Sequence, residues 1–115
     1  MKRLFLFVAA LAAATTAAQA QMSPSPYDMK FTLRDAPAGG VPLYSGMATG
    51  SKVIATIPGN ATGIILRWCR PELPFQAWQF GSLKAQRGIL DEAWCEIQTG
   101  GKIGNVEGKV LDPIR

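Results

Sequence analysis

The sequence of 115 residues contains no histidine and only two cysteines. A serine or cysteine nucleophile needs a neighbouring base such as histidine, so the usual hydrolase arrangement is missing. No CxxC pair and no third sulfur ligand are present, which disfavours a metal site. The adjacent carboxylates Asp91 and Glu92 are interpreted as solvated loop charges, because acid/base work needs carboxylates held across a cleft. The sequence therefore predicts no catalytic residues, no metal and no cofactor.

Long apolar runs are missing after residue 20, and basic residues are scattered there. A bilayer-spanning helix needs roughly 20 apolar residues, so no stable membrane span is expected in the mature chain. Arg67 and Arg70 are among the closest basic pairs in that part, and they flank a cysteine. Nucleic-acid binding needs a basic patch that follows the phosphate backbone. Nucleic acid is therefore excluded as an expected partner.

The first 20 residues have the pattern of an export signal. Two basic residues precede the apolar run Leu4–Ala14, and Ala18-Gln19-Ala20 fits the A-x-A cleavage rule. The run is too short to span a bilayer, and position 21 is not a cysteine, which disfavours a lipid anchor. The alternative is an uncleaved membrane anchor. We expect cleavage between Ala20 and Gln21, and a periplasmic or secreted protein.

The two cysteines, Cys69 and Cys95, are expected to form a disulfide. Exported proteins meet an oxidising environment, and only one pairing within the chain is possible. The alternative is a reactive or metal-binding cysteine, which no neighbouring ligand supports. On the chain-entropy model the bond would stabilise the fold by roughly 3–4 kcal/mol. That is a large share of the stability of a single small domain.

The remaining chain has the pattern of short strands separated by glycine and proline turns. Residues 21–28 are rich in proline and serine and are expected to be a flexible leader. Alternation and β-branched residues predict strands at 29–34, 41–44, 52–57, 63–69, 93–98 and 102–106. The fold class is therefore all-β, with about five to six short antiparallel strands in a small barrel or sandwich.

Two details of these strands can be predicted further. In the strand at 63–69, alternation puts Ile65, Arg67 and Cys69 on one face, and Ile64, Leu66 and Trp68 on the other. In the hairpin at 93–106, Gly100-Gly101 predicts a tight turn. Its Cys95 and Ile97 are expected to face the interior, and Trp94 is expected to be partly exposed.

A long connection, residues 70–92, separates two of the predicted strands. Two prolines near its start argue against a helix there, whereas residues 82–90 are compatible with one or two helical turns. Such connections are commonly functional or disordered. Its large aromatic side chains disfavour disorder, because they prefer burial. The cysteines lie at its two ends, so their disulfide would staple the base of the loop.

The order of these motifs resembles that of bacterial Src-homology-3-like domains. Residues 41–47 (VPLYSGM) occupy the place of an L-N-V-R-S-G-P-like segment, and residues 52–58 (KVIATIP) are similar to V-I-G-T-I-P. Residues 93–97 and 100–106 are similar to the family's G-W-x-x-V and T-G-W-V segments, and Val110-Leu111 fits the closing strand. The resemblance covers residues 41–111 apart from the long connection. It implies a Src-homology-3-like barrel over residues 29–115, with an insertion at 70–92.

The sequence departs from the family pattern at two positions near the recognition surface of related domains. Tyr44 replaces a common arginine, and Asn105 stands where the family usually has tryptophan. The second change is expected to leave that part of the usual groove shallow and polar. Ligand preferences known elsewhere in the family are therefore not transferred.

The resemblance implies a binding module of the cell envelope without catalysis. Its ligand would be a cell-wall peptide, peptidoglycan, or an extended segment of an envelope protein. The alternative is an inhibitor or structural subunit that docks on an envelope protein through the aromatic insertion 70–92. A small envelope enzyme has the least support.

Aromatic side chains are the ligand-binding candidates, because binding surfaces are enriched in tryptophan and tyrosine. The alternative is that most of these rings belong to the core of an undersized barrel. Tyr44 lies at the entrance to the glycine-rich loop, where related domains build a groove. The predicted ligand-binding residues are Tyr44, Trp68, Phe75, Trp78 and Trp94.

Overall fold

The computed structural model describes residues 22–115, so the predicted signal peptide and its cleavage site lie outside the described residues. Seven strands in this part of the chain form one antiparallel sheet. The strands are β1 (Lys30–Leu33), β2 (Val41–Tyr44), β3 (Val53–Ile57), β4 (Ile64–Arg70), β5 (Trp94–Thr99), β6 (Lys102–Glu107) and β7 (Leu111–Pro113). The helices are α1 (Phe75–Gln79), α2 (Leu83–Asp91) and the short 3-10 helices η3 (Pro26–Asp28) and η4 (Gly108–Val110).

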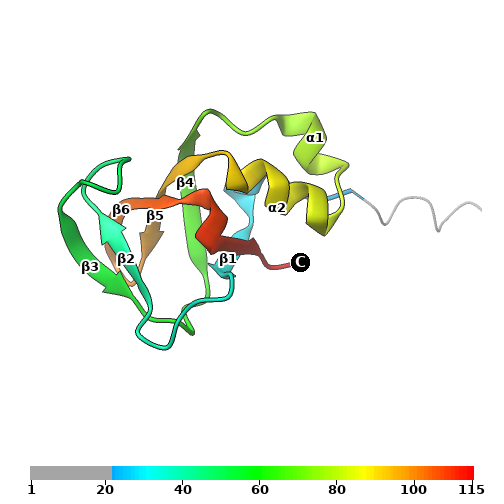
Figure 1. The fold of residues 1–115 in the computed structure, drawn as a ribbon. Helices are drawn as coiled ribbons and strands as arrows, with labels where there is room; N and C mark the ends of the chain where they lie inside the picture. Colours follow the sequence, from blue (N-terminus) through cyan, green and yellow to red (C-terminus); the bar gives the residue numbers. More distant parts are fainter. Residues whose placement is uncertain (1–21) are drawn as a thin grey trace, which may run out of the picture.

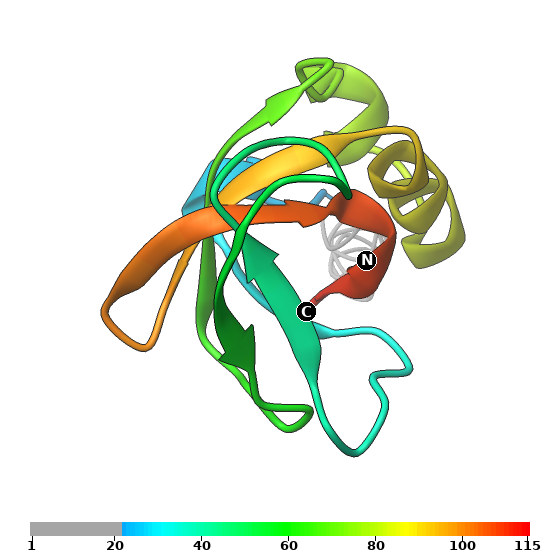
Figure 2. The same ribbon diagram turned by 60° about the vertical axis from the view of Figure 1, so that its left-hand side comes forward.

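The sheet is a curled half-barrel with the strand order β3-β2-β6-β5-β4-β1-β7 (Figures 1 and 2). Helices α1 and α2 lie together at one end of it (Figure 1), and α2 packs on η4 and β7. The all-β class predicted from the sequence is confirmed, with seven strands in place of five or six. Two short helices are added in the insertion.

Alternation along the strands fills the concave side of the sheet. Phe31 and Leu33 of β1 and Leu43 of β2 are buried. Their neighbours within the two strands, such as Thr32 and Tyr44, are partly exposed. On β5, Cys95 and Ile97 are fully buried, as predicted, and Trp94 and Glu96 are only half-buried. Successive strand residues point to opposite faces of a sheet, so Cys95 and Ile97 mark the inner face and Trp94 and Glu96 mark the outer face.

The hairpin β5–β6 forms as predicted. Thr99 pairs with Lys102, which leaves a turn of two residues between the strands. Gly100 and Gly101 have φ angles of 55° and 77°. Both angles lie in the left-handed region, which glycine enters without steric cost. The turn therefore depends on these two glycines.

A bulge in β4 corrects the predicted faces of that strand. The register with β5 shifts between Leu66 and Trp68, so Arg67 has no direct partner. Ile64 and Leu66 are buried as a pair, but the next buried residue is Cys69 rather than Trp68. The prediction that Cys69 shares a face with Ile65 is wrong, because an extra residue reverses the alternation beyond it.

The insertion is closed at its base by the predicted disulfide. Cys69 and Cys95 are direct partners in the β4–β5 register and are bonded to each other. Helix α2 begins where Ser82 Oγ accepts a hydrogen bond from the backbone N–H of Ala85, at 3.1 Å. This cap fits the predicted helical turns at 82–90. The insertion is thus a pair of short helices rather than an irregular loop.

The segment before β1 packs on the domain. The backbone N–H of Ser23 donates to the carbonyl of Gln79 at 2.9 Å, and Pro26 is buried. Ser25 caps η3, where its hydroxyl accepts from the backbone N–H of Tyr27. The sequence predicts a flexible leader at 21–28, whereas the structure places residues 22–28 against the insertion and the sheet.

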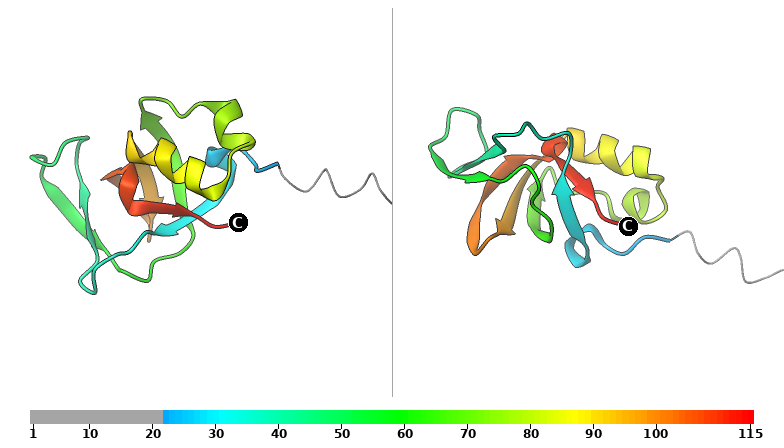
Figure 3. Two further views of the ribbon diagram at one scale, coloured as in Figure 1. Left: turned by 45° about the vertical axis from the view of Figure 1, so that its right-hand side comes forward. Right: turned by 90° about the horizontal axis from the view of Figure 1, so that it is seen from below.

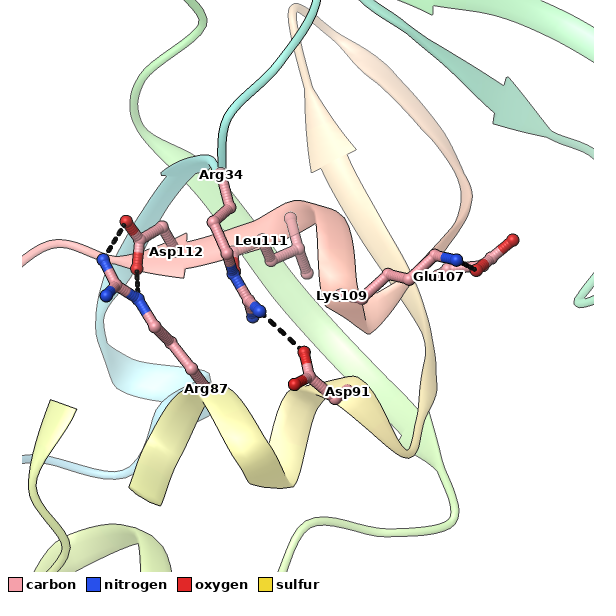
Figure 4. Close-up of polar contacts among 7 residues, drawn as sticks. All are labelled: Arg34, Arg87, Asp91, Glu107, Lys109, Leu111 and Asp112. Carbon is pink, nitrogen blue, oxygen red and sulfur yellow. Dashed lines mark hydrogen bonds and ion pairs between the residues drawn. The ribbon is translucent and has the colours of Figure 1, made fainter. Parts of the chain in front are cut away.

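Ion pairs attach α2 to the end of the sheet (Figure 4). Arg87 of α2 makes a two-pronged contact with Asp112 of β7, with both N···O distances at 2.9 Å. Arg34, which follows β1, reaches Asp91 at 2.6 Å and donates two further hydrogen bonds to the carbonyl of Leu111. Arg34 therefore joins β1, α2 and β7, and the insertion is fixed to one end of the half-barrel.

Candidate functional site

Three of the predicted ligand-binding residues gather on the outer face of the sheet. Tyr44 of β2 pairs with Asn105 of β6, Asn105 pairs with Glu96 of β5, and Glu96 pairs with Trp68 of β4. Directly paired residues of an antiparallel sheet point to the same side. Trp94 lies two residues before Glu96 and shares that side. We call the surface formed by Tyr44, Trp68, Trp94 and Arg70 the aromatic face.

The rings on this face are in contact with one another or with a cation. Tyr44 and Trp94 meet edge to face, with ring centroids 5.7 Å apart, across the intervening strand β6. Arg70 pairs with Trp94 in the register and places its guanidinium 5.4 Å from the ring centroid of Trp68. Trp68 is the most exposed of the three rings, at 41%. Such aromatic pairs and cation–π contacts hold large flat side chains in place.

Asn105, which stands in the family's tryptophan position, lies beneath this aromatic face. It is only 7% exposed, and its Nδ2 donates to the backbone carbonyl of Tyr44 at 3.4 Å. Tyr44–Asn105 is the single register pair that joins β2 to β6. The Asn105 side chain therefore strengthens a narrow junction of the sheet, in addition to lining its outer face.

An open pocket of 480 Å³ adjoins the exposed ring of Trp68. It contains charges of both signs from β4 and from the start of the insertion, although Arg67 is engaged with Glu96 at 2.9 Å. Burial raises the pKa of Tyr27 at its edge above the ordinary value. The lining residues are Tyr27, Arg67, Trp68, Cys69, Arg70 and Glu72.

Sequence reasoning missed the cationic part of the site. The sequence pattern presents Arg67 and Arg70 only as a basic pair. Simple alternation places Arg67 on the same face of the strand as Cys69. The bulge in β4 instead exposes both Arg67 and Trp68. The available signal was the i, i+2 spacing of Trp68 and Arg70, which places an aromatic ring and a cation on one face of a strand.

Trp78 does not belong to any exposed site. Its side chain is 0% exposed and packs against Phe31, with ring centroids 6.0 Å apart. A ring without exposed surface cannot contact a partner, so its assignment as a ligand-binding residue is corrected to core. The reason is that α1 turns this residue toward the open end of the half-barrel. Its indole N–H has no hydrogen-bond partner within residues 22–115.

Phe75 also lies apart from the aromatic face. It begins α1 and is 54% exposed, on the insertion rather than on the sheet. Phe80, at the end of the same helix, is 68% exposed. The structure thus brings Tyr44, Trp68 and Trp94 together, buries Trp78, and leaves Phe75 on a separate surface.

Residues 22–115 contain no group of three or more histidine, cysteine or acidic side chains placed to hold a metal ion. Within the same residues, no helix has the length and apolar character needed to cross a membrane.

Comparisons with known proteins add no relative. No family model, no curated protein and no solved structure matched this chain. Function is therefore inferred from the residues and geometry of the chain itself.

Proposed function

We propose that this protein is an exported binding module without catalysis, and that it holds an extended peptide on its aromatic face. The observation that carries this proposal is the meeting of Tyr44, Trp94 and Trp68 on one side of four neighbouring strands. Tryptophan and tyrosine bury a large area at low entropic cost, and they dominate the binding energy of many interfaces.

The charge on this face supports a peptide ligand. Arg70 stacks on Trp68 and forms no ion pair within residues 22–115. A guanidinium held in this way is available to a carboxylate of the ligand, and arginine binds carboxylates through two parallel hydrogen bonds. The peptide would be a cell-wall peptide or an extended segment of an envelope protein. Both contain amide groups, and both carry carboxylates.

The order of the motifs and the curled antiparallel sheet together support a Src-homology-3-like domain. In that interpretation the insertion is an addition to the half-barrel, and the aromatic face is a groove of the kind that receives extended ligands. Tyr44 and Asn105 are the two positions at which this groove departs from the family pattern. They would give it its own ligand preference.

The test compares variants of the aromatic face with a matched variant of the insertion. Tyr44→Ala and Trp94→Ala should weaken binding by about 1–2 kcal/mol, which is roughly a 5- to 30-fold loss of affinity. Phe75→Ala removes an exposed ring outside the face and should bind as the wild type does. Binding is measured by cosedimentation with purified cell wall and by titration against a protein captured from envelope extract, with thermal melts as the folding control.

The two binding assays also separate the two sources of the peptide. Loss of cosedimentation in the Tyr44 and Trp94 variants would identify a cell-wall peptide. Loss of protein capture alone would identify an envelope protein. Normal binding by both folded variants in both assays would contradict the proposal.

A second candidate function is docking on a partner protein through the insertion. The observation in its favour is the exposure of two phenylalanines at α1, 54% for Phe75, which begins the helix, and 68% for Phe80, which caps its end. The same titrations decide between the candidates. If Phe75→Ala loses the captured protein while Trp94→Ala retains it, the insertion is the docking surface and the protein is an inhibitor or structural subunit.

Export is the remaining part of the proposal. A disulfide, together with the lack of a membrane-crossing helix in residues 22–115, is consistent with an exported protein. Mass spectrometry of protein recovered from the exported fraction should show Gln21 as the first residue. Recovery of intact Met1 from that fraction would contradict cleavage.

A further inference from the structure

A groove on the insertion is separate from the aromatic face. It has a volume of 370 Å³ and lies between the segment that follows β4 and the helix α2. Figures 1 and 3 show this segment running alongside α2. The volume falls within the range of roughly 300–1,000 Å³ that is usual for ligand sites. The lining residues are Pro71, Glu72, Leu73, Pro74, Ala85, Gly88, Ile89, Glu92 and Ala93.

The walls of the groove are apolar. Leu73 and the two neighbouring prolines form one side. Ala85, Gly88 and Ile89 form the other side, because positions three and four apart lie on the same face of a helix. The disulfide joins β4 and β5 two residues before Pro71 and two residues after Ala93, so the two chain segments that form the walls are linked at their base.

Gly88 keeps the floor of the groove open. It lies inside a nine-residue helix, where glycine costs about 1 kcal/mol relative to alanine. A Cβ atom at this position would meet no other atom within 4 Å. Packing within the described chain therefore does not require glycine here. The space above Gly88 is free to receive a side chain from another molecule.

The rim of the groove is acidic. Glu72 and Glu92 are exposed lining residues, and no basic side chain lines the groove. Neither carboxylate forms an ion pair within residues 22–115. Opposite charges across an interface steer association and determine which partners bind. The complementary ligand is therefore apolar at its centre and positively charged beside it.

We propose that this groove binds a basic peptide segment. A large apolar side chain enters above Gly88 between Leu73 and Ile89, and a neighbouring lysine or arginine meets Glu72 and Glu92. This site goes beyond the proposed function, since it uses a different surface and a ligand of the opposite charge. Glu72 is the one residue that lines both this groove and the pocket beside Trp68.

The experiment uses the mature protein and two labelled peptides, GSLFKKSG and GSLFEESG, in fluorescence anisotropy titrations; the peptides differ only at two positions, which are lysine in one and glutamate in the other. The lysine peptide should bind, the glutamate peptide should bind at least tenfold more weakly, and added salt should reduce the difference. Gly88→Leu fills the groove and should weaken the lysine peptide at least tenfold. Gln76→Leu adds the same side chain to an exposed position of α1 and is the matched control.

Gly88→Leu is expected to fold, and thermal melts check this. Leucine has a higher helix propensity than glycine, and the site has room for its Cβ, so Gly88→Leu should melt no lower than the wild type. The double variant Glu72→Gln/Glu92→Gln keeps the shape of the rim and should abolish the preference for lysine. It is scored by the ratio of the two peptide affinities.

Four results would overturn the proposal. The first is no binding of the lysine peptide by the wild type, and the second is equal binding of both peptides. The third is unchanged affinity of Gly88→Leu for the lysine peptide. If Trp94→Ala loses affinity for the lysine peptide in that case, the peptide occupies the aromatic face. The fourth is a dimer in analytical ultracentrifugation that Gly88→Leu dissociates, which would assign the groove to a second copy of the chain. None of these results affects the Tyr44 and Trp94 assays that test the proposed function.

Discussion

The sheet and the insertion place their tryptophans in opposite ways. On the sheet, Tyr44, Trp68 and Trp94 lie on the outer face, and aliphatic residues such as Leu43 and Ile97 fill the inner one. In the insertion, Trp78 is fully buried while Phe75, three residues earlier on the same helix, is exposed. Tryptophan is therefore a surface residue on the sheet and a core residue in the insertion.

The difference follows from the open shape of the half-barrel. A curled sheet encloses its core along the strands but leaves its ends uncovered. The insertion covers one end, and Trp78 packs there on Phe31 of β1. The inner face of the sheet already has its own apolar residues, so its tryptophans lie on the outer face. The insertion therefore contributes to stability through its buried ring, whereas the sheet carries partly exposed aromatic rings on its outer face.

The largest expected effect is that of Trp78→Ala. It removes a fully buried ring and should lower the free energy of unfolding by about 3–5 kcal/mol. Phe75→Ala, on the same helix, should change it by no more than about 0.5 kcal/mol, because an exposed residue is usually tolerant. Urea unfolding of both variants checks this contrast. Similar values for the two rings would remove the distinction between core and surface within the insertion.

The second effect is that of replacing both cysteines by serine. The disulfide spans a sequence separation of 26 residues. Losing it should cost roughly 3–4 kcal/mol on the chain-entropy model. Hydrogen exchange should accelerate in residues 71–93 more than in β5 and β6, since the disulfide closes the base of the insertion. Uniform acceleration of exchange would show that the insertion and the sheet unfold as one unit.

The disulfide itself is checked by thiol labelling. Labelling of the native wild-type protein should find no free thiol, and two labelled cysteines would refute the bond.

The third effect concerns Arg34, which ties the two regions together. Arg34→Met keeps the aliphatic stem but removes the hydrogen bonds to the carbonyl of Leu111 and the contact with Asp91. Losing hydrogen bonds from a charged group should cost about 1–3 kcal/mol. The control is Glu96→Gln, which breaks an exposed pair on the sheet and should cost about 0–1 kcal/mol. Equal melting temperatures for the two variants would show that Arg34 does not hold the insertion in place.

The two regions also differ in how far the sequence predicts them. Alternation in the hairpin predicts that Cys95 and Ile97 face the interior, which is confirmed, and Gly100-Gly101 locates the turn correctly. The method failed at Arg67, because one extra residue in β4 reverses the faces and leaves no mark in the residue types. The paired cysteines were predictable, since the chain offers only one pairing.

The faces of the insertion could not be predicted in the same way. Helix α1 has five residues, which are too few to show a helical period of apolar residues. Its two aromatic residues, Phe75 and Trp78, therefore cannot be told apart from the sequence. Which one is buried depends on contacts with Phe31, which is distant in the sequence. The groove above Gly88 depends on the packing of residues 71–74 beside α2, and such long-range packing has no local pattern.

The smallest expected effect is a pH dependence at Tyr27, which lies where the leader, the insertion and the sheet meet. Burial is the main cause that raises the pKa of Tyr27 above its ordinary value of 10.0, the charge of Glu72 adds to it, and a hydrogen bond with the backbone of Leu73 opposes it. The folded state then holds the phenol proton more tightly than the unfolded state does. The corresponding stability is complete below about pH 10 and is lost as the pH rises through the raised pKa.

Tyr27→Phe removes the titrating group and tests this sign directly. Above about pH 10, the free energy of unfolding of the wild type should fall more steeply than that of the variant, while the two slopes should agree between pH 7 and about pH 9. Urea unfolding at a series of pH values measures both slopes, and titrations of the other tyrosine and of the lysines cancel in the difference. Parallel curves across the whole range, or a steeper fall in the variant, would show that the junction at Tyr27 is open to water. The leader would then lie loosely over the point where the insertion leaves the sheet, and the ion pairs of Arg34 and Arg87, together with the disulfide, would hold the insertion in position without it.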